Sequence, residues 1–438
     1  MAKTTRVRKD ISRDVARTVL ENGVRVWSER LPQASSAAVG VWVDAGSRYE
    51  ELKENGATHL LQRIALNGTE NRSADDIAKA IDLLGGDVQF TTSRDAAAWT
   101  ARTANAGLAD ALTLLADLAL RPKITQAALS AEQKVLLEQL RADERDADFN
   151  LDHMFLRSFW KGHGLCRPPH GRLLTVNGKV RLEDFKLKSL IRFHRETHHP
   201  RAITVAAAGD VTHARVANLA AELFGGLGEP KRTASSPSPK AYRFLALRNR
   251  PQFPGVRMEV GVPACGANDE RRHAAMLLDA VVGRGAGSRL ARMVRGKTLP
   301  AVEVTSSLLL FADTGVLSVR LRAVPKHAAE ALEGVVAVLR ELALVPVDEE
   351  ELNRAKATCK TAIVARLDSP KTRIEDLARQ ERYFGGPVDM QDDLAELDRV
   401  TPSGLRLLAA EWIAPHYLSL AALGNLNGVT IRPKTLRW

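Results

Sequence analysis

Apolar residues alternate with polar or small residues in two stretches that lie in opposite halves of the chain. Residues 36–51 (SAAVGVWVDAGSRYEE) and residues 255–270 (GVRMEVGVPACGANDE) both show this pattern. A period of two is typical of a half-buried β-strand. A helical pattern follows each strand: it begins near Asn55 and passes Leu66 in the first half, and it occupies RRHAAMLLDAVV in the second half. The two halves therefore start with the same predicted pair of elements.

The similarity between the halves continues in the same order along the chain. Residues 97–120 and residues 315–343 both read as a strand followed by an amphipathic helix. A long charged helix follows in each half. Each half then closes on a helix and a strand, in residues 199–211 (HPRAITVAAAGDV) and 414–426 (APHYLSLAALGNL). Four correspondences in one order indicate an internal duplication.

A segment rich in proline and serine separates the two halves and marks the predicted domain boundary. Residues 229–242 (EPKRTASSPSPKAY) contain few apolar residues, which is typical of an exposed linker. We therefore predict an N-terminal arm over 1–14 and two homologous domains over 15–228 and 243–438. Strands and helices that do not alternate strictly favour an α+β fold. We expect a mostly antiparallel sheet in each domain, with helices packed on one face, and a cleft enclosed by the domains.

The composition argues against several classes of protein. Hydrophobic residues make up 45% of the chain and charged residues 26%, which is ordinary for a globular protein. The sequence contains no run of about eighteen apolar residues, so we expect no membrane span. The net charge of +11 comes from basic residues interleaved with acidic ones, and aromatic residues are only 5%. No nucleic-acid partner is therefore expected, because neither a basic block nor a stacking surface is present.

The cysteines indicate the compartment. Cys166, Cys265 and Cys359 lie far apart and are odd in number, which favours a reducing compartment over a disulfide framework. The expected location is the cytoplasm. The first ten residues, MAKTTRVRKD, are basic and are not followed by an apolar segment, so an organellar matrix is the less favoured alternative.

Several segments together resemble a known family over nearly the whole chain. The sequence is similar to the pitrilysin superfamily of inverted zincins, and specifically to its processing-peptidase-like branch. The segments that carry the resemblance are TVLENGVRVWSERLP, VWVDAGSRYEELKENGATHLL and LNGTENRSADDIAKAIDLLGG in the first half, and GSRLARMVRGK and FADTGVLSVRL in the second. The resemblance implies a duplicated two-domain peptidase fold.

In that family the chemistry lies in a helix with the motif His-x-x-Glu-His. The two histidines share one face of the helix and bind zinc, and the glutamate accepts a proton from the zinc-bound water. The matching residues here read HLLQR, from His59 to Gln62 and Arg63. A third ligand in the family, a glutamate from a later helix, corresponds to Gln139. The upstream partner in that later helix, Glu132, is retained.

These replacements predict a site without metal chemistry. Gln62 at the base position is a neutral amide and cannot accept a proton. Arg63 at the second ligand position offers a positive charge and no lone pair. A shift of the third ligand by one residue would reach Glu138 and restore one carboxylate, but it would restore neither the second histidine nor the base. We therefore expect no catalytic residue, no metal and no cofactor, although zinc is present in active relatives.

With no metal expected, Arg63 has two possible arrangements. One is an ion pair or hydrogen-bonded bridge to Glu132, which would replace zinc as the link between the two helices. The other is an Arg63 side chain that points into solvent. The sequence leaves both open.

The second domain of active relatives carries an arginine and a tyrosine that help to hold the substrate backbone. Thr298 and Val302 stand in the matching stretch. Neither family residue is present, although Arg292 and Arg295 lie close by and could substitute. The substrate-binding residues are therefore left undefined.

Two other groups of residues could indicate a site. His194, His198 and His199 include pairs at metal-binding spacing, and residues 158–171 place Cys166 between two histidines. The family has a similar helix end and a similar loop without a catalytic use. The structural interpretation is therefore favoured for both groups.

The resemblance implies a non-catalytic subunit of a pitrilysin-type zinc metallopeptidase, which alone should cleave nothing. Such a chain would shape a peptide-binding chamber, bind unfolded peptide segments and support an active partner subunit in a heterodimer, or it would self-associate. An extended peptide could add as a strand to a sheet edge. Two alternatives stay open: a structural subunit like the core proteins of respiratory complexes, and a hydrolase with an atypical site.

Overall fold

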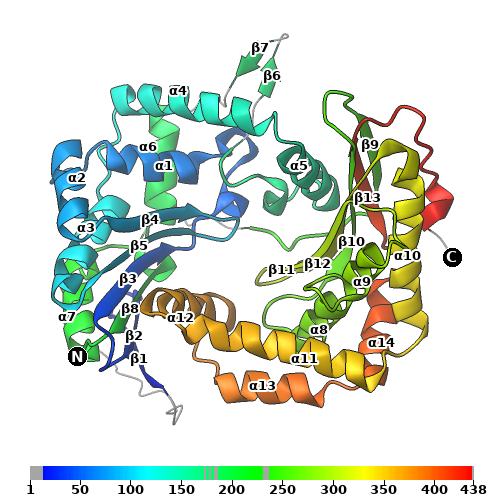
Figure 1. Ribbon diagram of the computed structural model, residues 1–438. Coiled ribbons are helices and arrows are strands. Elements are labelled where there is room, and N and C mark those ends of the chain that lie inside the picture. The colour runs from blue at the N-terminus through cyan, green and yellow to red at the C-terminus, as the bar shows by residue number, and fades with distance from the viewer. Residues whose placement is uncertain (1–12, 172–173, 177–178, 182–185, 230–235, 437–438) are drawn as a thin grey trace. The chain divides into compact units, whose positions relative to one another are not determined.

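The chain forms two compact units, each assembled from separate segments of the sequence (Figure 1). The computed structural model describes residues 13–171, 174–176, 179–181, 186–229 and 236–436. Most of the predicted N-terminal arm and residues 230–235 of the predicted linker lie outside these ranges. Unit 1 consists of Met1–Ala142, Arg167–Pro237 and Ala365–Pro387, and unit 2 consists of Asp143–Cys166, Ser238–Val364 and Val388–Trp438.

Unit 1 is built on a six-stranded mixed sheet in the order β1-β2-β8-β3-β5-β4. The β2 and β8 strands run parallel, and all other neighbours run antiparallel. The predicted alternating strand is β3, which lies near the middle of the sheet and is buried on both faces. The strands are β1 (Asp14–Val19), β2 (Arg25–Arg30), β3 (Ser36–Val43), β4 (Asp87–Thr92), β5 (Ala97–Ala104) and β8 (Ile203–Gly209).

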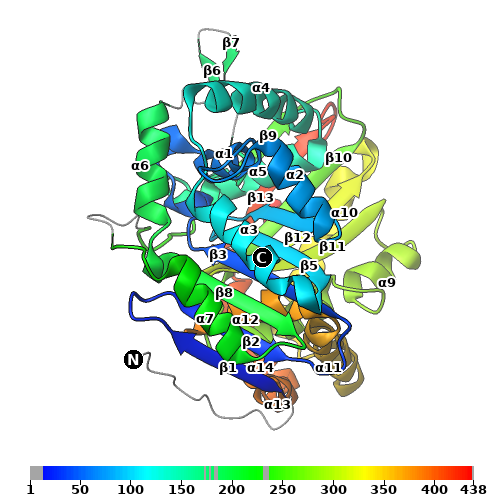
Figure 2. The same ribbon diagram turned by 90° about the vertical axis from the view of Figure 1, so that its left-hand side faces the viewer.

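One face of this sheet is covered by helices of the first half of the chain. The α3 and α7 helices pack on it through the main apolar core of the unit, and Figure 2 shows them in front of the strands. The α1, α4 and α6 helices share a smaller core, made mainly of leucines. The helices of this group are α1 (Ala57–Leu66), α2 (Ala74–Leu83), α3 (Leu108–Leu120), α4 (Gln126–Asp143), α6 (Leu187–Thr197) and α7 (His213–Phe224).

The other face of the sheet is covered by a helix from the second half of the chain. This helix, α12 (Pro370–Phe384), begins with a capping box at Ser369 and ends at Gly385, whose φ of 67° is left-handed. Ile374 and Leu377 of α12 pack against Trp27 of β2 and its apolar neighbours on the sheet. The β3 strand is therefore buried on both faces because a distant segment covers the second one.

Unit 2 repeats this sheet with one strand fewer. Its order is β11-β12-β10-β13-β9, in which β9 and β13 run parallel and the other neighbours antiparallel. Apart from β1, each strand of unit 1 has a counterpart in the same place and direction, as expected for a duplication. The strands are β9 (Leu245–Asn249), β10 (Val256–Ala264), β11 (Glu303–Leu310), β12 (Gly315–Ala323) and β13 (Ser419–Gly424).

The helices of unit 2 also lie on both faces of its sheet. The main core joins one face to six of the helices from the second half, all except α12. The α5 helix (Ala147–Phe159), from the first half, packs on the opposite face through Phe155 and Phe159. The predicted two-domain α+β fold is confirmed, with one helix exchanged in each direction. The six helices are α8 (Arg272–Val282), α9 (Arg289–Arg295), α10 (Ala328–Leu344), α11 (Glu349–Val364), α13 (Met390–Arg399) and α14 (Pro402–Trp412).

Two features complete the fold. The short strands β6 (Leu174–Val176) and β7 (Lys179–Arg181) pair as a separate antiparallel hairpin. Over the described ranges, the helices are too short or too polar to cross a membrane.

Candidate functional site

The helix that carries the HLLQR motif, α1, is held at its N-terminus by a buried carboxylate. Glu50 accepts hydrogen bonds from the main-chain N–H of Gly56 at 2.7 Å and of Thr58 at 2.8 Å. A negative charge is stabilised at this end of a helix. Burial raises the pKa of Glu50, and the hydrogen bonds from the helix end oppose that shift. Gly56 has a φ of 100°, so this turn favours glycine.

Arg63 of α1 faces α4 and forms an ion pair with Glu132. Its Nε atom donates a hydrogen bond to Glu132 Oε2 at 2.5 Å, and Asn67 Nδ2 donates to Glu132 Oε1 at 2.6 Å. The Glu132 side chain is 10% exposed and that of Arg63 is 32% exposed. Of the two arrangements left open by the sequence, the structure therefore has the ion pair.

Gln62, at the position of the family's base, faces the sheet. Its Nε2 atom donates to the main-chain oxygens of Ala98 at 3.0 Å and Thr91 at 3.3 Å. The Thr92 hydroxyl donates to Gln62 Oε1 at 2.5 Å. The amide is buried, and both its donor and its acceptor are used. Gln62 therefore links α1 to β4 and β5.

His59 is the one retained metal ligand of the motif, and its ring is uncharged near neutral pH. Its Nε2 atom is buried and has no hydrogen-bond partner among the described residues. Burial, followed by the nearby His170 and Arg63, lowers the pKa of His59 to about 4, while a hydrogen bond with Gln139 opposes the shift. The ring centroids of His59 and His170 are 4.7 Å apart.

The packing of α4 against α1 also bears on which residue of α4, 138 or 139, corresponds to the third ligand. Gln139 is partly buried on α4, and its side chain lies close enough to His59 to raise the pKa of that ring. Glu138, one residue earlier, has a 70% exposed side chain and pairs with Arg141 on its own helix at 2.5 Å. A carboxylate at 138 therefore does not reach this site, and Gln139 takes the third position.

The comparisons with known proteins show the family of the chain. A family model described as "Insulinase (Peptidase family M16)" matches residues 25–169, and one described as "Peptidase M16 inactive domain" matches residues 184–359. A protein of Mycobacterium leprae named "Uncharacterized zinc protease" is 30% identical, over 97% of this chain and 95% of its own length. The chain belongs to peptidase family M16. The predicted resemblance to the processing-peptidase branch of the pitrilysin superfamily is confirmed.

Other M16 relatives match along nearly the full chain. A Schizosaccharomyces pombe protein named "Probable mitochondrial-processing peptidase subunit beta" is 27% identical, over 94% of this chain and 92% of its own length. The crystal structure of a protease from Helicobacter pylori superimposes with a TM-score of 0.85 at 21% identity, covering 94% of this chain and 99% of that one. The superposition on the Helicobacter pylori structure shows that the two chains share a fold.

The residues at the M16 metal position do not fit a zinc ion. His59 supplies one neutral nitrogen, but Arg63 brings a fixed positive charge to the second position and Gln139 a neutral amide to the third. Glu132, the nearby carboxylate, already accepts hydrogen bonds from Arg63 and Asn67. Within the described ranges, no group of three or more His, Cys, Asp or Glu side chains is arranged to hold a metal ion.

Thr298 and Val302 are the residues expected at the positions of the substrate-backbone arginine and tyrosine of active relatives. Thr298 hydrogen-bonds to a main-chain carbonyl of α9, and Val302 is an exposed apolar side chain. Arg292 and Arg295, which could have substituted, are engaged locally. Arg292 pairs with Glu351 at 2.9 Å, and Arg295 donates to a main-chain carbonyl at 2.5 Å.

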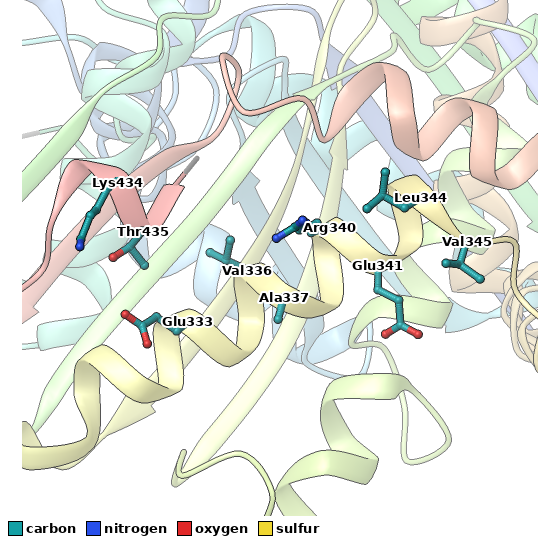
Figure 3. Close-up of a pocket in the computed structure, with 9 residues that line it drawn as sticks. All are labelled: Glu333, Val336, Ala337, Arg340, Glu341, Leu344, Val345, Lys434 and Thr435. Atoms are coloured by element: carbon teal, nitrogen blue, oxygen red, sulfur yellow. The ribbon is translucent and has the colours of Figure 1, made fainter. Parts of the chain in front are cut away.

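A groove of about 490 Å³ runs along α10 in unit 2 (Figure 3). Lys434 and Thr435 lie opposite the helix. The groove mixes charged side chains with apolar ones, among which Leu344 and Val345 are exposed. Its described lining contains no histidine, cysteine or serine.

In the described part of the chain, the histidines and cysteines singled out in the sequence have the following surroundings. His194 and His198 stack with ring centroids 4.2 Å apart in unit 1. Burial raises the pKa of the thiols of Cys265 and Cys359 to about 11, so both stay protonated near neutral pH. Cys166 is partly exposed and free.

The structure adds three residues to the site that sequence reasoning missed. Asn67 lies one helical turn after Arg63, and this spacing was the available signal for its contact with Glu132. Thr92 and His170 come from the end of a strand and from a loop. Their contacts with Gln62 and His59 depend on tertiary structure, which no local pattern indicates.

Proposed function

We propose that this M16 chain is a non-catalytic subunit that pairs with an active member of the family. The observation that carries the proposal is the Arg63–Glu132 ion pair at the metal position. A neutral amide at residue 62 cannot take a proton from water, and an arginine at residue 63 cannot bind a metal. The chain keeps the fold of the peptidase while the groups that perform the reaction are replaced.

The remaining surface of unit 1 supports a role in peptide binding. The β4 strand is an edge of its sheet and pairs only with β5 among the described strands. An edge strand presents main-chain groups to which an extended peptide can add as a further strand. The β4 strand also contacts α1. We infer that unfolded peptide segments bind along β4 and need no metal to do so.

The partner is inferred from the relatives. One relative is named as the beta subunit of a mitochondrial-processing peptidase, and a subunit name implies assembly with another chain. The proposed arrangement is a heterodimer in which this chain shapes a peptide-binding chamber and stabilises the active subunit. Self-association in the absence of the partner is compatible with it. The proposed location is the cytoplasm, since bacterial relatives named as zinc proteases match along nearly the full chain.

The decisive experiment measures zinc content and peptidase activity of the purified full chain, alone and after co-expression with active M16 proteins of its source. We expect almost no zinc and no cleavage of fluorogenic peptides by the chain alone. We also expect a stable complex and increased cleavage when the active member is present. A control with the partner's own metal-site glutamate replaced should lose all activity.

Two results would contradict the proposal. One is stoichiometric zinc together with peptide cleavage by the isolated chain. The other is constitutive co-purification with a membrane complex and no effect on any M16 peptidase, which would favour the purely structural role.

A further inference from the structure

A pocket in unit 1 is lined by the end of α3, by the loop that follows α3 and by α6. Its volume is about 640 Å³, which is within the usual range for small-molecule sites. The loop contributes residues 120–124 and α6 contributes one face that includes His194, Arg195 and His198. Figure 2 shows α6 and α3, the two helices that flank this pocket. None of the residues used in the proposed function lines this pocket.

The loop that forms one wall is fixed by main-chain hydrogen bonds. Glu70 N–H donates to the carbonyl of Arg121 at 2.9 Å, and Lys123 N–H donates to the carbonyl of Gly68 at 3.0 Å. These bonds make a short antiparallel bridge between Thr69 and Pro122. The pocket wall therefore does not need to order when a ligand binds, which favours binding.

Two of the three cationic side chains of this pocket have no carboxylate partner among the described residues. Lys123 and Arg195 have no carboxylate within 4.0 Å among the described residues. Arg121 lies 3.9 Å from Asp117. That carboxylate already accepts three closer hydrogen bonds, from Thr69, Asn71 and Arg72.

Glu70 is the acidic residue of the pocket lining. Three cationic side chains (Arg121, Lys123 and Arg195) therefore face one carboxylate, which leaves the pocket with a formal charge of +2. An excess of positive charge of this kind attracts anions.

The two histidines of the pocket form a fixed aromatic wall. His194 donates through Nε2 to the carbonyl of Ala119 at 3.1 Å, and His198 bonds to the Thr197 hydroxyl through Nδ1 at 2.9 Å. Burial lowers the pKa of both rings, so the wall is uncharged near neutral pH. Glu70 and the two histidines are not arranged to hold a metal ion, since the described part of the chain has no such group.

The rest of the lining is apolar. Leu120 and Ile124 of the loop and Ile191 of α6 are partly exposed within it. The pocket therefore combines cationic side chains with an apolar and aromatic surface. A ligand that matches both needs a compact, highly charged anionic group and an organic part.

We propose that this pocket binds a small organic phosphate with two or more phosphate groups, of which a nucleoside polyphosphate is the representative class. Arg121, Lys123 and Arg195 hold the phosphates as donors of charge-assisted hydrogen bonds. The apolar loop residues and the histidine wall contact the organic part. The site is separate from the peptide-binding role proposed above and does not depend on it.

The test uses the full chain with metal-free ATP and with inorganic pyrophosphate at low ionic strength, measured by isothermal titration calorimetry and thermal shift. Both probes should bind and raise Tm, because a ligand that binds only the native state stabilises it. ATP should bind more tightly than pyrophosphate because of the organic part. Added salt should weaken both.

Charge variants make the test specific. Lys123→Gln and Arg195→Gln should each weaken ATP binding by roughly threefold or more, whereas Glu70→Gln should tighten it. Arg215→Gln, which removes an exposed cation on α7 of the same unit, should change nothing. Each variant should keep the ligand-free Tm of the parent, which separates loss of binding from loss of folding.

Three outcomes would overturn the proposal. The first is the absence of binding of either probe at low salt. The second is binding that Lys123→Gln and Arg195→Gln leave unchanged, which would place the anion elsewhere. The third is equal affinity for pyrophosphate and ATP, which would reduce the pocket to a site for inorganic anions only.

Discussion

At the scale of single residues, the change of Arg63 matters because of what it contacts. A histidine ligand at residue 63 would face a zinc dication. Arg63 is itself the cation, and its Nε atom lies 2.5 Å from Glu132 Oε2. The residues at the ligand and base positions (His59, Gln62, Arg63 and Gln139) carry a formal charge of +1. In an active relative, two histidines and two glutamates would carry −2, which a zinc ion balances. The local charge balance therefore needs no metal.

This reasoning predicts that zinc binding returns when the ligand set is restored. The triple variant Gln62→Glu/Arg63→His/Gln139→Glu places the second imidazole one helical turn after His59 and returns the third carboxylate. We expect the variant to hold about one zinc ion per chain and the parent to hold almost none. Metal analysis after dialysis, and the visible absorption of the cobalt form, would measure this without any activity assay.

Two controls keep that prediction sharp. Gln62→Glu/Gln139→Glu, which keeps Arg63, should bind little zinc although its carboxylates are restored. Glu138 should have no influence, so Glu138→Gln in the triple variant should retain the metal. Zinc binding by the parent at the level of the triple variant would contradict the interpretation of the site.

Sequence reasoning left the expected third ligand position open between residues 138 and 139, and the helical geometry favours residue 139. Positions 138 and 139 could not be distinguished by spacing alone. Adjacent residues on a helix point about 100° apart, so only one of them can face α1. In the structure Gln139 is partly buried and its side chain affects the pKa of His59, whereas Glu138 is exposed. The contact with His170 was not predictable, because a loop brings that residue back to α1.

At the scale of elements, α12 is joined to the sheet of unit 1 by buried ion pairs as well as by apolar contacts. Glu381 of α12 accepts hydrogen bonds from Arg17 at 2.7 and 2.9 Å and from Trp27 Nε1 at 2.7 Å. Glu29 of β2 accepts from Arg13 at 2.6 and 2.9 Å and also pairs with Arg373 of α12. Breaking one side of such a pair costs more than the pair contributes, since a charge is left buried.

We therefore predict that Glu381→Gln weakens the docking of α12. The variant leaves Arg17 without its bidentate partner and should lower the free energy of unfolding by about 3 kcal/mol. Urea unfolding followed by tryptophan fluorescence would measure it, because Trp27 lies at this contact. The matched control is Glu396→Gln, which removes an exposed pair with Arg399 and should cost less than about 1 kcal/mol. Equal losses for the two variants would contradict the prediction.

The elements themselves were largely predictable, but their partners were not. Alternation identified the strands that became β3 and β10, because each has one face toward its own helices. The amphipathic pattern of α12 predicts that one face of this helix packs on another element. The pattern does not identify which sheet that element belongs to. The second face of β3 is covered only in the folded chain, so the alternation there predicted a half-buried strand, whereas β3 is buried on both faces.

At the scale of the whole molecule, each unit is completed by a helix from the other half of the chain. Unit 1 includes residues 365–387, which carry α12, and unit 2 includes residues 143–166, which carry α5. The two helices take equivalent places. Each packs on the sheet of the other half of the chain, on the face that the helices of that other half leave uncovered. The duplication is thus accompanied by a reciprocal exchange.

The exchange predicts how fragments of the chain behave. A fragment over residues 15–228, the N-terminal domain predicted from the sequence, lacks α12 and would expose Trp27 and Trp42. We expect this fragment to aggregate or to bind a hydrophobic dye. The same fragment joined by a flexible linker to residues 365–387 should be monomeric and should unfold cooperatively, as seen by calorimetry. Cooperative unfolding of the shorter fragment at the same Tm would contradict this prediction.

The exchanged helix also has a consequence for synthesis on the ribosome. The strands of unit 1 are complete once residue 209 has emerged, but α12 follows only after residue 384. At roughly 5 to 20 residues per second, the apolar face that α12 covers stays uncovered for about 9 to 35 seconds. During that interval a nascent chain exposes two tryptophans and several alanines to solvent. We therefore expect the yield of folded protein to depend on ribosome-associated chaperones.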